Sequence, residues 1–431
     1  MRLYKREMSR LALVLVIALV ARLAFVAWWQ QTQNLSDRRF ELPDSQSYWE
    51  LGQHMARGEP YQFGTADRSV FRAPGYPLLL AGLFRVVGAD APPSAARVLG
   101  AVFGTLSVAG IYWLSRAMFS PDVAFLAAAI VAVYPEAIAT SALPLSDGPF
   151  CLWMLLQLVF FKLAATGAPR RDLVFAALAG AMAGIASLTR PSWLLFTPGV
   201  VAVWAVGSQF EKRQLVLGGT MLVALALVMS PWWVHNWRVV GRFVPTTLQV
   251  GASLYDGLNP AADGSSDMRF VPRFEEQLRA ADAAHSPAAT DPPFEYRLDR
   301  LMRSESLDWA AAHPSRVIEL AGTKLLRLWN FWPNEPSFRS WWVRLAVLVT
   351  YTPILLLAIV GAWMIRRRTF DLMLLVAPAI YLTALHVVFI GSLRYRQPAM
   401  LTLAIPAAMA VCRLCGRGDT PSNQIDAIPV S

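Results

Sequence analysis

Two aspartates and two arginines are the side chains of this chain whose types and positions point most directly to chemistry. Asp44 opens the predicted helix DSQSYWELGQHMARG, and Asp147 in LPLSDGPF stands just before an apolar run. Arg394 and Arg396 flank Tyr395 in GSLRYRQPAM, a short turn between two apolar runs. Converging carboxylates can serve as a general base and as ligands for a substrate or metal, whereas guanidinium groups bind phosphate through paired hydrogen bonds. These residues predict an acid–base site beside a phosphate site.

The acids also have a structural interpretation. Aspartate is a favoured N-cap, and both aspartates stand where a predicted helix starts, although capping does not exclude chemistry. Glu136, in VYPEAIATS, lies near the end of an apolar run, either in a polar cavity or just clear of the lipid. Arg22 lies inside the first apolar run, where a charge at the bilayer centre costs about 2.5–3.5 kcal/mol. It either snorkels outward, pairs with an acid or lines the same cavity as the aspartates.

The arginine pair has a predicted geometry. In an extended turn, the side chains of Arg394 and Arg396 point to one side and that of Tyr395 to the other, so the two guanidiniums converge on one spot. Pro398 then starts the last helix, where its missing N–H costs nothing. Alternatively, both arginines bind bulk lipid headgroups or snorkel at a helix end.

Other polar residues complete the candidate site. The predicted donor-phosphate ligands beyond the arginine pair are Arg190, Arg72 and Lys324. The predicted substrate or metal ligands beyond the acids are Tyr48, His235 and Asn236, of which the last two also suit interfacial hydrogen bonding. If a divalent cation such as Mg²⁺ or Mn²⁺ is used, Asp44 and Asp147 are expected to hold it. The five histidines show no HxxxH or HExxH spacing, which argues against a zinc hydrolase.

The elements that position these residues are membrane spans. The chain is 55% hydrophobic with a mean hydropathy of +0.41, and only 16% of its residues are charged, against about 25% in a soluble domain. Its apolar runs of about 17–22 residues match the thickness of a bilayer core. The sequence predicts an all-α polytopic membrane protein. Basic residues flanking the spans explain the net charge of +10, so nucleic-acid binding is not needed.

About ten spans are expected from hydropathy. They lie near residues 9–29, 95–118, 123–142, 148–166, 173–189, 192–207, 215–233, 341–365, 371–391 and 398–414. The first run is too long for a signal peptide and ends in a bulky Trp pair, so we expect it to be retained. Basic residues of alternate short loops place those loops in the cytoplasm: Arg170, Arg171, Lys212, Arg213 and Arg366–Arg368. Trp pairs mark the opposite boundary: Trp28–Trp29, Trp232–Trp233 and Trp341–Trp342.

This topology divides the chain into regions. Residues 1–233 form a transmembrane core whose first outer loop, 30–94, carries the candidate base and two short helices. Residues 234–340 form an extracytoplasmic segment, with a mobile loop at 256–293 and helices over 295–330 that break at His313–Pro314. Residues 341–415 return to the membrane and residues 416–431 form a cytoplasmic tail. Arg190, Arg394 and Arg396 then lie outside, in short loops that are normally poor in arginine.

The order of these motifs resembles that of a known superfamily. Asp44 and Tyr48 are followed by FRAPGYPLLLAGLFRVVG, YPEAIATSALPLSD, SLTRPSWLLFTP, SPWWVHNWRVVGRFV, GASLYDGLNP and LRYRQPAM. This series resembles the GT-C superfamily of polyprenyl-phosphate-sugar-dependent glycosyltransferases, in the branch of protein O-mannosyltransferases and lipid A aminoarabinose transferases. Ser45 stands where many relatives have a second acid, and HNW stands where many have RNW.

The resemblance implies a function. A sugar would pass from a polyprenyl phosphate to a hydroxyl of a protein, lipid or glycan on the outer face of a bacterial inner membrane. Asp44 would act as the general base with inversion at the anomeric carbon, and Arg394 and Arg396 would stabilise the leaving lipid phosphate. The chain contains no GxxxxGK[ST] loop for a nucleotide donor.

A lipid or sugar-lipid permease is the alternative. It would need access from both sides, discontinuous helices near the midplane and often two related halves. The short inner loops and the lack of visible halves favour the enzyme. A membrane scaffold is a third class, but it would not explain why Arg190, Arg394 and Arg396 share a face.

Overall fold

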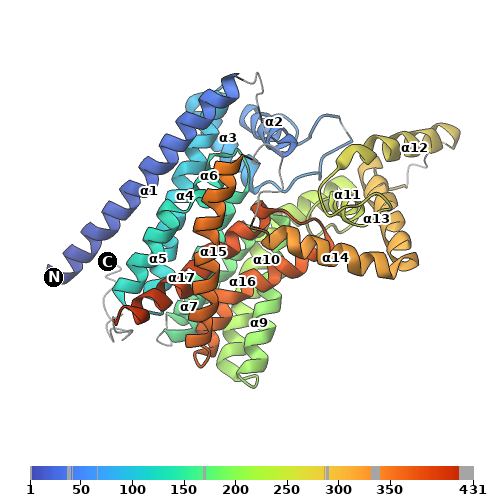
Figure 1. Cartoon of the computed structure of the whole chain (residues 1–431). Helices are drawn as coiled ribbons and strands as arrows, with labels where there is room; N and C mark the ends of the chain where they lie inside the picture. The colour runs from blue at the N-terminus through green and yellow to red at the C-terminus, as the bar shows by residue number, and fades with distance from the viewer. Residues whose placement is uncertain are drawn as a thin grey trace.

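The computed structural model describes residues 2–416 apart from 36–39, 41, 66, 168–170, 286, 288–290 and 332–339. In this part of the chain every regular element is a helix (Figure 1). The predicted all-α polytopic fold is therefore confirmed. The predicted tail beyond residue 416, and Arg170, lie outside the described residues.

Long apolar helices form the body of the molecule. Among the described residues, eight helices are long and apolar enough to cross a membrane. They are α1 (Arg2–Leu35), α4 (Pro93–Arg116), α7 (Asp147–Thr166), α8 (Asp172–Thr189), α10 (Lys212–Val240), α15 (Trp341–Met364), α16 (Thr369–Val388) and α17 (Leu393–Leu414). The pair α5 (Pro121–Val133) and α6 (Pro135–Ala142), bent by 56°, makes a ninth if it counts as one span.

The expected tenth span, at 192–207, is shorter than predicted. A 3₁₀ turn, η1 (Pro191–Trp193), is followed by α9 (Phe196–Gly207), which has 12 residues. At a rise of about 1.5 Å per residue, such a helix covers roughly 18 Å of a core that is about 30 Å thick. The span was expected because the stretch is apolar. Pro191 ends the preceding helix, however, and the next α-helix begins only at Phe196.

Shorter helices gather at one end of the bundle. Between α1 and α4 lie α2 (Pro43–Arg57) and α3 (Gly75–Val87). Between α10 and α15 lie α11 (Val250–Gly257), η2 (Met268–Phe270), α12 (Val271–Ala284), α13 (Phe294–Ala312) and α14 (Pro314–Trp329). Figure 1 shows α2, α11, α12 and α13 on the side of the bundle away from the start of α1 and the end of α17. We call this the site end, because the candidate residues lie there.

Most of the predicted short helices are confirmed, with one error. The helices α2 and α3 occupy the two stretches predicted for them, and α13 and α14 break at His313 as expected. The predicted mobile loop at 256–293 is wrong over α12. Phe274 on α12 is buried against Tyr255 and Leu298, and this apolar anchor holds a stretch whose Ala- and Asp-rich composition suggested a loop.

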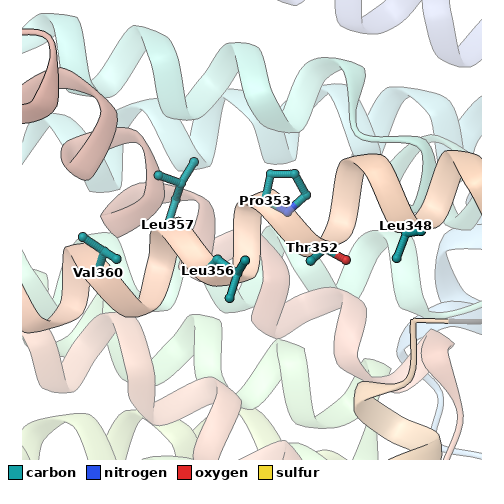
Figure 2. Close-up of a pocket in the computed structure, with 6 residues that line it drawn as sticks. All are labelled: Leu348, Thr352, Pro353, Leu356, Leu357 and Val360. Carbon is teal, nitrogen blue, oxygen red and sulfur yellow. The ribbon is translucent and has the colours of Figure 1, made fainter.

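The last span, α17, is the most buried of the membrane helices. It packs against α15, α16 and α5. Its approach to α15 is so close that a Cβ at Gly361 would collide with the Pro406 carbonyl. Small residues allow such close contacts between membrane helices. The outward side of α15 instead carries an apolar groove of about 470 Å³, lined by Leu348, Thr352, Pro353, Leu356, Leu357 and Val360 (Figure 2). No charged side chain lines it.

Arg22 is buried inside the bundle, and its contacts match none of the three alternatives that the sequence offered. Its guanidinium hydrogen-bonds the carbonyl oxygens of Ala18, Ala132 and Val131 at 3.1–3.3 Å. The last two carbonyls lie at the end of α5, and Pro135 lacks the N–H that a continuous helix would donate to the Val131 carbonyl. Arg22 therefore supplies donors to a broken span, rather than snorkelling, pairing with an acid or lining the predicted cavity.

Candidate active site

Helix ends bring the predicted residues together at the site end. Asp44 is the second residue of α2, Asp147 is the first of α7, and Arg394 is the second of α17. Arg190 directly follows α8, and Arg72 lies just before α3. Each acid thus lies in the first turn of a helix, where the helix dipole favours negative charge.

Arg394 connects the two acids. Its Nη2 lies 3.3 Å from Oδ2 of Asp44, and its Nε lies 3.7 Å from Oδ2 of Asp147. The two carboxylates come from helices about a hundred residues apart in sequence, so only the fold brings them to one guanidinium. The predicted convergence of the two acids is therefore present, with an arginine between them.

A second arginine pairs with each acid on its other oxygen. Arg72 Nη2 lies 2.6 Å from Oδ1 of Asp44, and Arg190 Nη1 lies 2.5 Å from Oδ1 of Asp147. The result is an alternating row, Arg72–Asp44–Arg394–Asp147–Arg190, which we call the charge network. Three guanidiniums and two carboxylates leave it one formal positive charge in excess, which suits an anionic ligand.

The network is open at Asp44. The Asp44 side chain is 34% exposed, whereas that of Asp147 is 4% exposed. A molecule approaching from outside the bundle can therefore reach the first carboxylate but not the second. Asp44 is the acid placed for proton transfer, and Asp147 is placed to hold Arg190 and Arg394.

Arg72 is fixed by a polar cradle. Its Nε donates to Oγ of Ser47 at 3.1 Å and its Nη1 donates to Oε1 of Gln249 at 2.7 Å, while its guanidinium lies 5.0 Å from the ring centre of Tyr48. The Tyr48 hydroxyl lies 3.3 Å from Oγ of Ser146. Sequence reasoning missed Ser47, Ser146 and Gln249. Ser47 lies one helical turn after the acid, which was a usable signal, but nothing local marked the other two.

The environment of Asp44 sets its protonation. Burial raises the pKa of this carboxyl, but the Arg72 and Arg394 guanidiniums outweigh burial and bring the pKa down to about 2. Asp44 is therefore ionised at neutral pH. While both arginines hold it, it is also a weak base, because a good general base has a pKa near the working pH.

Arg396 does not converge with Arg394, contrary to the predicted extended turn. The helix α17 starts at Leu393, so these arginines are two positions apart on a helix and do not share a face. Arg396 is fully buried, pairs with Oε1 of Glu136 at 2.5 Å and donates to the Asn330 carbonyl at 2.5 Å. Glu136 also accepts from the Tyr134 hydroxyl at 2.7 Å. This ion pair joins α17 to α6, separately from the charge network.

The remaining predicted residues have other partners. Lys324 on α14 donates to the Val388 carbonyl at 2.7 Å, and burial lowers its pKa to about 8. Asn236 on α10 donates to the Val244 carbonyl at 2.9 Å. His235 stacks on Trp232 with ring centres 4.8 Å apart. The structure gives none of these three a contact with the charge network.

A divalent cation does not fit this arrangement well. Among the described residues, no three His, Cys, Asp or Glu side chains come together in a way that could hold a metal ion. Both acids are already paired with arginines, and a cation between them would stand beside the Arg394 guanidinium, which would repel it.

Comparison with known proteins decides the type of fold. A family model described as dolichyl-phosphate-mannose-protein mannosyltransferase matches residues 71–235, which include Arg72, Asp147 and Arg190. The oligosaccharyltransferase AglB from Archaeoglobus fulgidus, in complex with an inhibitory peptide and a dolichol-phosphate, is similar over 95% of this chain, with a TM-score of 0.60 and 15% identity. The chain has a GT-C fold. The resemblance inferred from its motifs is confirmed.

Other comparisons delimit the likeness of this chain to solved structures. The apo form of the Archaeoglobus enzyme matches with a TM-score of 0.56, and the chain covers 50% of the length of that protein. ArnT from Cupriavidus metallidurans, bound to undecaprenyl phosphate, matches with a TM-score of 0.46 and 16% identity. No curated protein matches the chain in sequence. The chain thus spans about half the length of the first solved structures that it resembles.

Proposed function

We propose that this protein is an integral membrane glycosyltransferase that moves a sugar from a polyprenyl-phosphate donor to an acceptor hydroxyl with inversion. The observation that carries the proposal is the charge network: one accessible carboxylate beside three guanidiniums, at one end of a GT-C fold. The match of residues 71–235 to a family named for a dolichyl-phosphate-sugar donor supports the same chemistry.

The donor phosphate is proposed to bind the arginines of the charge network. Guanidinium groups form bidentate, charge-assisted hydrogen bonds with phosphate oxygens, and the excess positive charge favours the anion. The likeness to a protein solved in complex with a dolichol-phosphate supports a lipid phosphate as the ligand. As the bond from the anomeric carbon to the phosphate oxygen breaks, these groups would stabilise the negative charge that develops on the leaving lipid phosphate.

Donor binding is also proposed to activate Asp44. A phosphate that engages Arg394 and Arg72 draws them away from the carboxylate, which removes the groups that lower its pKa. Asp44 then becomes a stronger base. It accepts the proton of the acceptor hydroxyl while the hydroxyl oxygen bonds to the anomeric carbon opposite the phosphate. This order keeps the base weak until the donor is present. The predicted cation has no part in the proposal.

The acceptor is proposed to be a protein, lipid or glycan outside the cytoplasm, with the enzyme in a bacterial inner membrane. The basic residues Lys212, Arg213 and Arg366–Arg368 lie at starts or ends of α10, α15 and α16 away from the site end. Basic loops stay in the cytoplasm, which would place the charge network outside.

The permease alternative draws on one observation, the broken span α5–α6, because transporters often contain discontinuous helices. At the break, Glu136 pairs with Arg396, and Arg22 donates to the Ala132 carbonyl at the end of α5. The polar groups of the break therefore already have partners within the protein. An open pathway would need polar groups free to meet a substrate. We therefore favour the enzyme.

Mass analysis of extracytoplasmic glycans tests the function. A strain lacking the protein is complemented with wild type, Asp44→Asn or Asp90→Asn. An amide cannot accept the proton, so Asp44→Asn should lose nearly all transfer and leave the sugar missing from its acceptor. Asp90 is an exposed carboxylate of the same segment, so its variant should restore the wild-type pattern. Identical glycans with and without the protein would refute the proposal.

A further inference from the structure

Tyr395 lies where three helix ends of the site meet. It belongs to the first turn of α17, and its ring stacks on that of His386 in the last turn of α16, with centres 4.1 Å apart and planes 6° apart. The guanidinium of Arg190, which follows the end of α8, lies 4.9 Å from the same ring centre. His386 is in turn held through Nδ1 by the Ile390 carbonyl at 3.0 Å. The ring is thus fixed by one neighbour and contacts an arginine of the charge network.

Tyr395 also contacts the second arginine of the network. The Arg394 guanidinium carbon lies 4.9 Å from the ring centre, and its Nη2 lies 3.3 Å from the Tyr395 hydroxyl oxygen. One tyrosine therefore contacts both guanidiniums that share Asp147. The sequence prediction had this side chain pointing away from the arginines.

These contacts address an electrostatic problem. Arg190 and Arg394 carry like charges and share one carboxylate, so they repel each other in a poorly hydrated site. The negative face of an aromatic ring attracts a guanidinium, and the attraction increases when the site is shielded from water. Arg190 is 8% exposed and His386 is 5% exposed, so the ring is shielded from water on the side of these two neighbours.

We propose that Tyr395 is a positioning residue that holds Arg190 and Arg394 side by side to receive the donor phosphate. This inference rests on the proposed function. When a phosphate engages the guanidiniums, it competes with Asp147 for their N–H groups, while the ring and its hydroxyl continue to fix the separation of the two arginines. Tyr395 then lowers the conformational-entropy cost of fixing two arginine side chains around one phosphate. Its effect should therefore appear in the affinity for the donor.

The chain provides a matched control in Tyr351. The Arg396 guanidinium lies 3.6 Å from the ring centre of this buried tyrosine, whose hydroxyl donates to the Trp329 carbonyl at 3.1 Å. Arg396 in this pair is bound to Glu136 and is not part of the charge network. A general loss of packing would affect both tyrosines alike, whereas positioning for phosphate would affect only Tyr395.

The test titrates a polyprenyl monophosphate into the full chain in lipid nanodiscs and records thermal unfolding of the same samples. Tyr395→Leu removes ring and hydroxyl, and should weaken binding about tenfold. Tyr395→Phe keeps the ring and loses one hydrogen bond, and should weaken it about threefold. Tyr351→Leu should lower the unfolding temperature and leave affinity unchanged.

Each outcome decides a different point. Wild-type affinity in Tyr395→Leu, or an equal loss of affinity in Tyr351→Leu, would overturn the positioning role. If Tyr395→Leu does not fold, unchanged affinity in Tyr395→Phe overturns it instead. If the wild-type protein itself does not bind the lipid phosphate, the proposed function fails and not this inference alone.

Discussion

The individual charged residues differ in which neighbour balances them. Asp44 and Asp147 share Arg394, yet one side chain is 34% exposed and the other 4%. Arg394 belongs to a network with an excess of positive charge, whereas Arg396, two residues later, is matched by Glu136 and buried carbonyls. Similar residue types thus have separate roles, because burial and partners differ over a few ångströms.

The pH dependence of transfer follows from Asp44. Its pKa is lowered in the free protein, so its ion pairs contribute stability above the ordinary carboxyl pKa and lose it as pH falls through about 2. If donor binding removes the arginines, the pKa rises in the complex. We expect the acidic limb of kcat to lie at least about one pH unit above that of kcat/KM, since these report the bound and free enzyme. Coincident limbs in a pH–rate profile with the identified donor would contradict donor-linked activation.

The sequence was sufficient to find both acids and all three arginines that meet in the charge network. Their position near predicted outer boundaries was readable from hydropathy and from loop charge. The sequence did not predict the partners of Arg396 and Lys324. These partners, Glu136 and the Val388 carbonyl, are brought close only by the packing of distant helices. Gln249 carried no local signal, since an amide in a loop is common and only its contact with Arg72 gives it a role.

At the scale of helices, α17 is the element on which the site depends most. It carries Arg394 and Tyr395 in its first turn and is the most buried span. The predicted start at Pro398 was late by five residues because the helix begins at Leu393 and continues through this proline. Proline in a helix interior removes one hydrogen bond, which membrane helices tolerate when neighbours surround them.

Close packing of α15 on α17 gives a prediction. Gly361→Ala should destabilise the fold by about 1–3 kcal/mol, because the added methyl group would overlap the Pro406 carbonyl on the other helix. Gly219→Ala is the matched control, since a Cβ there meets nothing within 4 Å. Alanine is the better helix former, so that variant should be neutral or slightly stabilised. Thermal unfolding of both in detergent measures the effect, and equal unfolding temperatures would count against the close contact.

At the scale of the whole molecule, the chemistry is concentrated at one end of the bundle. The charge network and the helices α2, α3 and α11–α14 lie at the site end, while several basic residues lie at the opposite helix ends. This separation agrees with the proposed sidedness, in which loops rich in Lys and Arg stay in the cytoplasm.

Labelling with a membrane-impermeant thiol reagent tests that sidedness in intact cells. In a background in which the exposed Cys415 is replaced by serine, Arg269→Cys should react directly, because residue 269 lies between α11 and α12 and its side chain is 90% exposed. Arg367→Cys, between α15 and α16, should react only after the cells are permeabilised. The reverse pattern would place the site in the cytoplasm and end the proposed topology.

The most direct test of the charge network as a donor site compares two arginine-to-lysine variants. A polyprenyl monophosphate is titrated into wild type, Arg394→Lys and Arg396→Lys in nanodiscs. Lysine keeps the charge but loses the planar fork, so Arg394→Lys should weaken binding about tenfold or more. Arg396→Lys should lower the unfolding temperature, because lysine cannot reproduce the bonds to Glu136 and Asn330, and should bind the lipid as wild type does. Unchanged affinity in Arg394→Lys, or an equal loss in both variants, would contradict the account.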